Sequence, residues 1–385
     1  MAMKELPALP AGFKVEVEFP ITGRWTFLNH AGVAPISARA AEAIKVFAQQ
    51  ARDDAYLTGH WYRRAEKVRR LSARLINAAP EEIAFVKNTS EGLAFVANGL
   101  DWKPGDLIVS SSVEYPSNVY PWMEVARRYG VKHVMVPEKS GRIEVEDILA
   151  AASAGPTRLL ALSQVEYASG FRHDLEVIGK FCRSRGIYLC VDGIQACGAL
   201  PVDVQRMNID FLSADGHKWM LGPEGAGFFF CRRELLGQLH PEIGWMNVIN
   251  ADDYGHYDFT LKPDARRFEC GSYNIPGLLG LGASLELLLE VGMETITVRL
   301  LALTDYLCER LTDKGYQVVS SRKAGEQSGI VSFISRGQDQ RELVGRLQTQ
   351  GIVIVLRENR LRASPHFYNS LADMDRLVDA LPVDR

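Results

Sequence analysis

Two ionisable side chains follow two apolar runs of the chain, and they give the first indication of chemistry. The run 187–191 ends directly before Asp192, and the run 211–214 ends shortly before Lys218. Unbroken apolar runs of this kind are typical of buried strands in a parallel sheet. Because ligands bind beyond the carboxyl ends of such strands, we expect this carboxylate and this amine to face one crevice.

A lysine amine and a buried carboxylate are the groups that pyridoxal 5′-phosphate (PLP) requires. The amine forms a Schiff base with the cofactor and, once released, moves the Cα proton of an amino acid. The carboxylate keeps the pyridine nitrogen protonated, and a buried aspartate needs such a cationic partner. Lys218 is therefore the predicted catalytic residue. Gln195, one helical turn beyond Asp192, is expected to hydrogen-bond the ring hydroxyl.

Each of these residues also has an ordinary structural explanation. A single lysine after a strand is usually a solvated surface residue, and an aspartate at a strand end is often a helix cap. The combination of both with His217 and a glycine-rich turn at 222–227 favours the cofactor.

The segment 191–230 resembles the class V aminotransferase and cysteine desulfurase family, a branch of the fold type I PLP enzymes. The resemblance runs from FLNHAG (27–32) to RLRASPHFYN (360–369). It implies a three-layer α/β fold with a mostly parallel sheet, a smaller α+β C-terminal domain, and a homodimer.

The motif KNTSEGL (87–93) resembles the family's phosphate-binding turn. Helix N-terminal N–H groups and the hydroxyls of Thr89 and Ser90 would hold the anion there, with His217 also assigned to the cofactor. A plain helix cap with Glu91 in the first turn is the alternative.

The segment FECGSYNIPG (268–277) resembles one that crosses the dimer interface of the family. Gly271 and Ser272 would then complete the phosphate site of the neighbouring subunit. A loop that stays within one subunit is the alternative.

Two tyrosines stand where relatives carry other residues. Tyr115, in 112–122, matches the position whose ring lies over PLP, which is histidine in desulfurases; tyrosine stacks equally but is no imidazole acid or base. Tyr167 matches a position that is often asparagine, and we expect it near the cofactor or substrate.

Arg362 resembles the arginine that binds the substrate α-carboxylate, because a planar guanidinium pairs with a carboxylate through two hydrogen bonds. Arg357 and Arg360 are the neighbouring alternatives. Asn29 and His30 are expected to line the same pocket, with a simple strand end and turn as the alternative.

Two departures from the family stand out. Asp215 replaces a serine that contacts the phosphate, so either its carboxylate points away or the phosphate is displaced. In addition, 351–364 carries no cysteine and almost no loop, whereas desulfurases insert a thiol-bearing loop before the carboxylate-binding arginine. Persulfide chemistry is therefore disfavoured.

Composition restricts the remaining possibilities. The 385 residues carry a net charge of −3, which favours neither nucleic acid nor an anionic membrane as a partner. The six cysteines form no CxxC pair and the eight histidines no HxxxH pair, so no metal is expected. The N-terminus lacks the features of a signal peptide, and the predicted location is cytoplasmic.

Apolar runs alternate with amphipathic helices over most of the chain, as in a sheet covered on both faces. We expect an N-terminal arm (1–20) packed on the small domain, a large PLP-binding domain (21–280) and a small C-terminal domain (281–385). A long helix, over 278–292 and then 295–314, is expected to join them. The expected strands are 83–86, 106–110, 133–136, 158–163, 187–191, 211–214, 227–231, 317–320, 330–334, 352–357 and 360–366.

The predicted function is PLP-dependent chemistry at the Cα of an amino acid, most readily as an aminotransferase. A PLP-dependent lyase or an amino-acid epimerase is the alternative, since one scaffold in this family supports all of these outcomes. A cysteine desulfurase ranks lower, and a non-catalytic scaffold is opposed by Asp192, Lys218 and Arg362.

Overall fold

The computed structural model describes residues 6–384, and its centre is a seven-stranded sheet in the order β2-β8-β7-β6-β5-β3-β4. The strands are β2 (Ile83–Val86), β3 (Leu107–Ser111), β4 (Lys132–Val136), β5 (Thr157–Ser163), β6 (Tyr188–Asp192), β7 (Phe211–Asp215) and β8 (Gly227–Cys231). Neighbouring strands are parallel except at β8, which is antiparallel to β2 and β7. The mostly parallel α/β sheet is confirmed.

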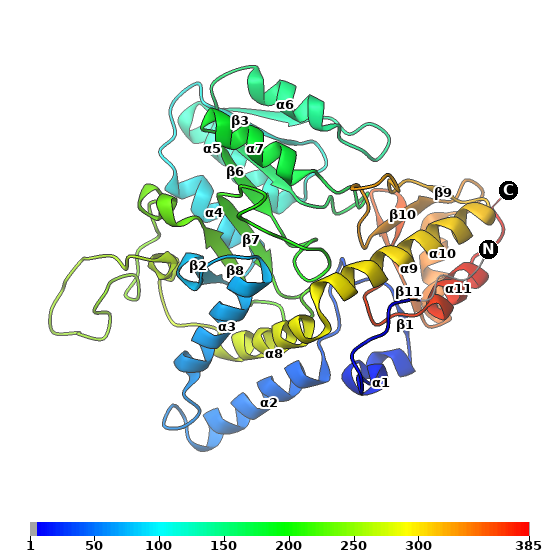
Figure 1. Ribbon diagram of the computed structural model, residues 1–385, viewed down its shortest axis with the longest axis horizontal. Helices are drawn as coiled ribbons and strands as arrows, with labels where there is room; N and C mark the ends of the chain where they lie inside the picture. The colour runs from blue at the N-terminus through cyan, green and yellow to red at the C-terminus, as the bar shows by residue number, and fades with distance from the viewer. Residues whose placement is uncertain (1–5, 385) are drawn as a thin grey trace.

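Helices cover both faces of this sheet, because alternate side chains of each strand enter different cores. In β8, Phe228 and Phe230 pack into one core and Phe229 packs into the other. The first face is covered by α3 (Trp61–Leu75), α6 (Val145–Ser153), α7 (Leu175–Arg185) and α8 (Ile275–Val291). The second is covered by α4 (Thr89–Gly99) and α5 (Tyr120–Tyr129). The result is three layers, with α2 (Ala38–Asp53) packed outside on α8 (Figure 1).

The C-terminal part has a sheet and a core of its own, reached through α9 (Met293–Asp313) (Figure 1). Its antiparallel sheet has the order β12-β13-β10-β9. The elements here are β9 (Gln317–Val318), β10 (Val331–Ile334), α10 (Gln340–Thr349), β12 (Val355–Arg357), β13 (Arg360–Ala363) and α11 (Leu371–Ala380). The division at 280 stays a prediction.

Two expected elements are each divided in the structure. The run 352–357 is not one strand: β11 (Ile352–Val353) pairs with β1 (Thr26–Phe27), and after Ile354 the chain joins β13 as β12. The two expected stretches of the long helix, 278–292 and 295–314, are separate helices, since α8 and α9 meet at 81° around Gly292, whose φ is +87°. Glycine adopts that backbone conformation at little cost.

The described part of the N-terminal segment lies against the C-terminal part, and it includes the short helix α1 (Val15–Glu18). Phe19 stacks on Tyr368 with ring centroids 3.9 Å apart, and Arg299 donates to the carbonyl of Pro7. Within residues 6–384 no single helix has the length and apolar character of a membrane span. Only α8 and α9 taken together reach that length and composition.

Candidate active site

The carboxyl ends of β2, β3, β5, β6 and β7 lead into a cavity of about 380 Å³. A cavity of about 410 Å³ beside α6 and α7 is slightly larger, but none of its described lining residues is a lysine. The cavity of about 380 Å³ is lined by ten of the residues predicted from the sequence: Asn29, Thr89, Ser90, Tyr115, Tyr167, Asp192, Gln195, His217, Lys218 and Arg362.

Lys218 and Asp192 are both buried, and each shifts the titration of the other. Burial lowers the pKa of Lys218 to about 8, although the charge of Asp192 opposes this shift. Burial also raises the pKa of Asp192 to about 6, against the N–H of Ile194, which donates to it at 3.0 Å. Within residues 6–384 Asp192 has no ion-pair partner at contact distance, so a cationic ring nitrogen would supply its counter-charge.

The N-terminus of α4 also lines the cavity. The side chain of Asn88 caps this helix by accepting from the N–H of Glu91 at 2.9 Å. Because the first N–H groups of a helix have no helical acceptor, those of Thr89 and Ser90 are donors suited to an anion. The helix cap and the anion site, treated as alternatives from sequence, are thus compatible with each other.

Asp215 lies beside this helix start, but its carboxylate is already engaged. It accepts from the N–H of Gly216 at 2.7 Å and pairs with the ring of His217 at 2.8 Å. The N–H of Asp215 donates to the hydroxyl of Thr89 at 3.1 Å. The pairing with His217 reduces the repulsion that an anion at α4 would otherwise meet.

Arg362 also lines the cavity and is 1% exposed. It donates to the carbonyl of Tyr167 at 2.7 Å and to the side chain of Asn29 at 3.4 Å, while its Nε has no acceptor. Within residues 6–384 it has no carboxylate partner, and burial, together with nearby Arg357, lowers its pKa to about 9. A buried guanidinium in this state fits an anionic ligand. By contrast Arg360 is paired with Glu138 at 2.9 Å.

Two predicted residues are not in the cavity lining. His30 is fully buried, with its ring nitrogens bonded to the carbonyl of Ser364 at 2.8 Å and the hydroxyl of Tyr368 at 2.6 Å. It directly follows Asn29, which forms a bridge with Ser364, and it begins the next turn of the chain. Ser272 lines a separate hollow beside Lys87 and Cys270, so within one subunit it does not reach this cavity.

Gln195 and Tyr115 line the same cavity as Lys218, but Gln195 is already hydrogen-bonded within the protein. Its side-chain amide donates to the carbonyl of Ala31 at 3.1 Å and accepts from Trp219 at 2.8 Å. These bonds fix its orientation, and one N–H of the amide is left for a ring oxygen. The Lys218 amine lies 5.4 Å from the ring centroid of Tyr115.

Two buried glutamates that sequence reasoning missed hold the two tyrosines in place. Glu114 accepts from the N–H and hydroxyl of Ser163 at 2.7 and 2.6 Å, and Glu166 accepts from the hydroxyl of Ser111 at 2.7 Å. Each therefore binds the end of the other strand, and the rings of Tyr115 and Tyr167 meet at 5.2 Å. The signal was the repeated pattern Ser-x-Val-Glu-Tyr at 111–115 and 163–167.

A tight hairpin occupies the place where a thiol-bearing loop would precede Arg362. β12 and β13 are joined by Glu358 and Asn359, both with positive φ, as in a two-residue hairpin turn. The hydroxyl of Tyr167 donates to Glu358 at 2.5 Å. Five of the six cysteines are buried, and the exposed one, Cys270, is not in the cavity lining.

The sequence is similar to those of known PLP-dependent enzymes. The aminotransferase class-V family model matches residues 26–377. A probable cysteine desulfurase of Pyrococcus abyssi is 30% identical over 332 residues, which are 82% of each chain. Other relatives are also named cysteine desulfurases, among them CsdA of Escherichia coli. One relative, from Bacillus subtilis, is named an uncharacterized aminotransferase; it is 28% identical, and the match covers 92% of this chain and 95% of the relative's chain.

Two solved structures share the fold over nearly their whole length. The apo cysteine desulfurase of Thermococcus onnurineus has a TM-score of 0.88 at 26% identity, covering 98% of both chains. The cystine C–S lyase C-DES, in complex with its reaction product cysteine persulfide, has a TM-score of 0.86 at 25% identity, covering 94% of this chain and 98% of its own. The chain belongs to the class V aminotransferase family of fold type I enzymes, and its cofactor is PLP.

Proposed function

We propose that this protein is a PLP-dependent lyase that cleaves the Cβ–S bond of a sulfur-containing amino acid by β-elimination. The observation that carries the proposal is the two-residue turn Glu358–Asn359, which leaves the cavity of Lys218 and Arg362 without a thiol. Sulfur chemistry is supported by the desulfurase and cystine lyase names of the relatives. An elimination needs no protein thiol, because the sulfur leaves with the electrons of the broken bond.

Each residue has one task in this proposal. PLP, when bound, withdraws electrons from Cα. Arg362 binds the α-carboxylate, and Asp192 keeps the ring nitrogen protonated. Lys218 removes the Cα proton and returns it to the departing sulfur, which a pKa of about 8 favours near neutral pH. Thr89 and Ser90 with the start of α4 would hold the phosphate, and Tyr115 would lie over the ring.

The proposal predicts one set of products for the holoenzyme. Cystine, cysteine and S-alkylcysteines are incubated with it, and pyruvate, ammonia, alanine and released thiol or persulfide are measured. With water the elimination gives pyruvate, ammonia and one sulfur product in equal amounts, and it needs no added 2-oxo acid as amino acceptor. Alanine as the product would identify a desulfurase. A requirement for a 2-oxo acid would identify the aminotransferase predicted from sequence, and Cα deuterium exchange alone an epimerase.

Cys270→Ser provides the matched control, because Cys270 is the exposed cysteine. Unchanged pyruvate formation in this variant supports elimination without a protein thiol. Loss of sulfur release would assign a desulfurase-type thiol to Cys270 and contradict the proposal.

The same proposal includes a homodimer in which Gly271 and Ser272 complete the partner's phosphate site. It is supported by the position of Ser272 outside the cavity of its own subunit. Sedimentation of the holoenzyme should give twice the chain mass, and a monomer with full activity would contradict it.

A further inference from the structure

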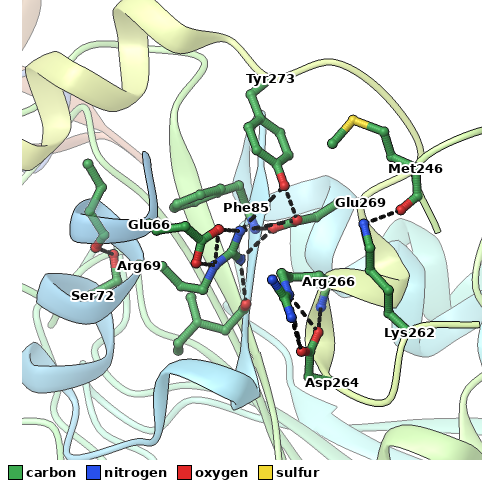
Figure 2. Close-up of polar contacts among 12 residues, drawn as sticks. Glu66, Arg69, Ser72, Phe85, Met246, Lys262, Asp264, Arg266, Glu269 and Tyr273 are labelled. Carbon is green, nitrogen blue, oxygen red and sulfur yellow. Dashed lines mark hydrogen bonds and ion pairs between the residues drawn. The ribbon is translucent and has the colours of Figure 1, made fainter. Parts of the chain in front are cut away.

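A buried ion pair lies at the free edge of the central sheet, outside the cavity (Figure 2). Arg69 of α3 binds Glu269, which follows the short helix η5 (Ala265–Phe268), through Nη1–Oε1 at 2.6 Å and Nη2–Oε2 at 3.2 Å. Both side chains are 2% exposed. Burial opposes the charge on Arg69, but Glu269 and, to a smaller extent, Glu66 together more than offset this and raise its pKa.

This ion pair takes the place of a neighbouring strand for β2. β2 is the first strand of the sheet and pairs there with β8 alone. The N–H of Phe85 donates to Glu269 Oε1 at 2.7 Å, and Arg69 donates to the carbonyl of Ile83 at 2.7 Å. The guanidinium also lies 4.3 Å from the ring centroid of Phe85. Two of the outer backbone groups of β2, the N–H of Phe85 and the carbonyl of Ile83, are thereby satisfied by side chains.

Tyr273 extends the same network to the segment that carries Ser272. Its hydroxyl donates to Glu269 Oε2 at 2.6 Å (Figure 2). Glu269 and Tyr273 are thus tied together at the two ends of the stretch that contains Cys270, Gly271 and Ser272. We call Arg69, Glu269 and Tyr273 the edge clamp.

The edge clamp lies between the two proposed sets of phosphate donors. Phe85, which Glu269 holds, is three residues before Asn88 and the start of α4. Ser272 is three residues after Glu269. We propose that the edge clamp is a positioning device for the cofactor phosphates: it sets the 88–90 turn, which would hold the phosphate of its own subunit, and Ser272, which would complete the phosphate site of the partner. None of the three residues of the edge clamp lines the cavity of Lys218, and the inference rests on the proposed phosphate placement, not on which reaction follows.

A buried charge pair is a costly way to join two segments if stability alone is at stake. Apolar residues of similar volume often give equal or greater stability at such a place. Charged groups with fixed hydrogen-bond directions do define the relative position of the parts they join. The retained charges therefore favour a geometric role.

The test compares PLP with pyridoxal, which lacks the phosphate, in Glu269→Gln. The dissociation constants of both are measured by spectral titration. We expect PLP to bind about tenfold or more weakly, while pyridoxal binding stays within about twofold. Equal weakening of both ligands, or of neither, would show that the edge clamp does not act on the phosphate and would overturn the proposal.

Glu66→Gln is the matched control, because Glu66 binds the same guanidinium at 3.1 Å but has no hydrogen bond to β2 or to 268–274. It removes an equal charge, and PLP binding should not change. If Glu66→Gln weakens PLP binding as much as Glu269→Gln, the effect comes from the charge of Arg69 and the proposal fails.

Tyr273→Phe keeps the ion pair and carries the test if Glu269→Gln does not fold. This variant should weaken the binding of PLP, by a smaller factor than Glu269→Gln does, and should leave the binding of pyridoxal unchanged. It should also shift the circular dichroism of the bound cofactor. Thr89→Ala with Ser90→Ala checks the phosphate placement separately. If that double variant binds PLP normally, the placement and the proposal are both wrong. If it weakens PLP while Glu269→Gln and Tyr273→Phe do not, only the edge clamp is refuted.

Discussion

Arg69 and Arg362 are both buried arginines, yet their surroundings differ in kind. Arg69, in the edge clamp, is paired with Glu66 and Glu269 and bonded to a backbone carbonyl. Arg362, in the cavity, has no carboxylate partner among residues 6–384 and keeps one buried nitrogen without an acceptor. A paired buried charge is compensated within the structure, whereas an unpaired one is retained at a larger cost and indicates a ligand of opposite charge.

Lys218 extends this comparison, and its removal should have the largest effect on activity. Lys218→Ala should reduce turnover by roughly 10²–10⁴-fold or more, because the proton-transferring group is lost. Folding, followed by circular dichroism, should be retained. Within residues 6–384 Lys218 forms no ion pair at contact distance, so its removal breaks no buried salt bridge. Lys180→Ala, at an exposed position of α7, is the control and should leave turnover unchanged. Full activity of Lys218→Ala would refute the assignment.

The two arginines should differ next in stability. Arg69→Ala should lower the free energy of unfolding by about 3–5 kcal/mol, because Glu269 is left buried without its cation. Arg362→Ala should leave the apoprotein as stable as before or make it more stable, because it removes an unpaired buried charge. Denaturant titration of both apoproteins measures this. An equal loss of unfolding free energy in the two variants would show that the two arginines do not differ in this way.

Activity should show the opposite order. Arg362→Ala should raise KM for amino acids by roughly 10–100-fold, the range expected for a lost charge-assisted hydrogen bond. Amines that lack the carboxylate should be affected much less. Arg360→Ala is the control, because Arg360 is two residues away and already paired with Glu138. A larger effect at Arg360 would transfer the carboxylate-binding role to it.

The smallest effect concerns pH. The pKa of Lys218 is lowered by burial to about 8 in the folded protein, so the neutral amine gains population as pH rises through that value. The rate at which the apoprotein captures PLP should then fall about tenfold for each pH unit below 8. Stopped-flow absorbance measures it. A midpoint above 10 would mean that Lys218 is not in the buried environment described here.

The residues that line the cavity could be predicted from the sequence better than the buried residues that surround it. Asp192 and Lys218 could be placed because the apolar runs before them define strand ends, and Arg362 because its motif is local. His30 could not be separated from Asn29, since which of two successive side chains faces a cavity depends on the register of the segment. Arg69 and Glu269 are 200 residues apart, and neither carries a local signal of the other.

Long-range packing also explains the errors in the elements. The run 352–357 contains no break that local propensity would reveal, and its division at Ile354 follows from two different partner strands. The bend between α8 and α9 was signalled by Gly292, but an isolated glycine is also tolerated within helices. The resemblance between 111–115 and 163–167 was visible but acquires meaning only once β3 and β5 are neighbours.

The site of covalent attachment tests the central claim most directly. The holoenzyme is reduced with borohydride, which fixes the cofactor to the nitrogen that holds it, and its peptides are mapped by mass spectrometry. The pyridoxyl group should be found on Lys218 alone. Its presence on another lysine, or its absence from every peptide, would contradict the account.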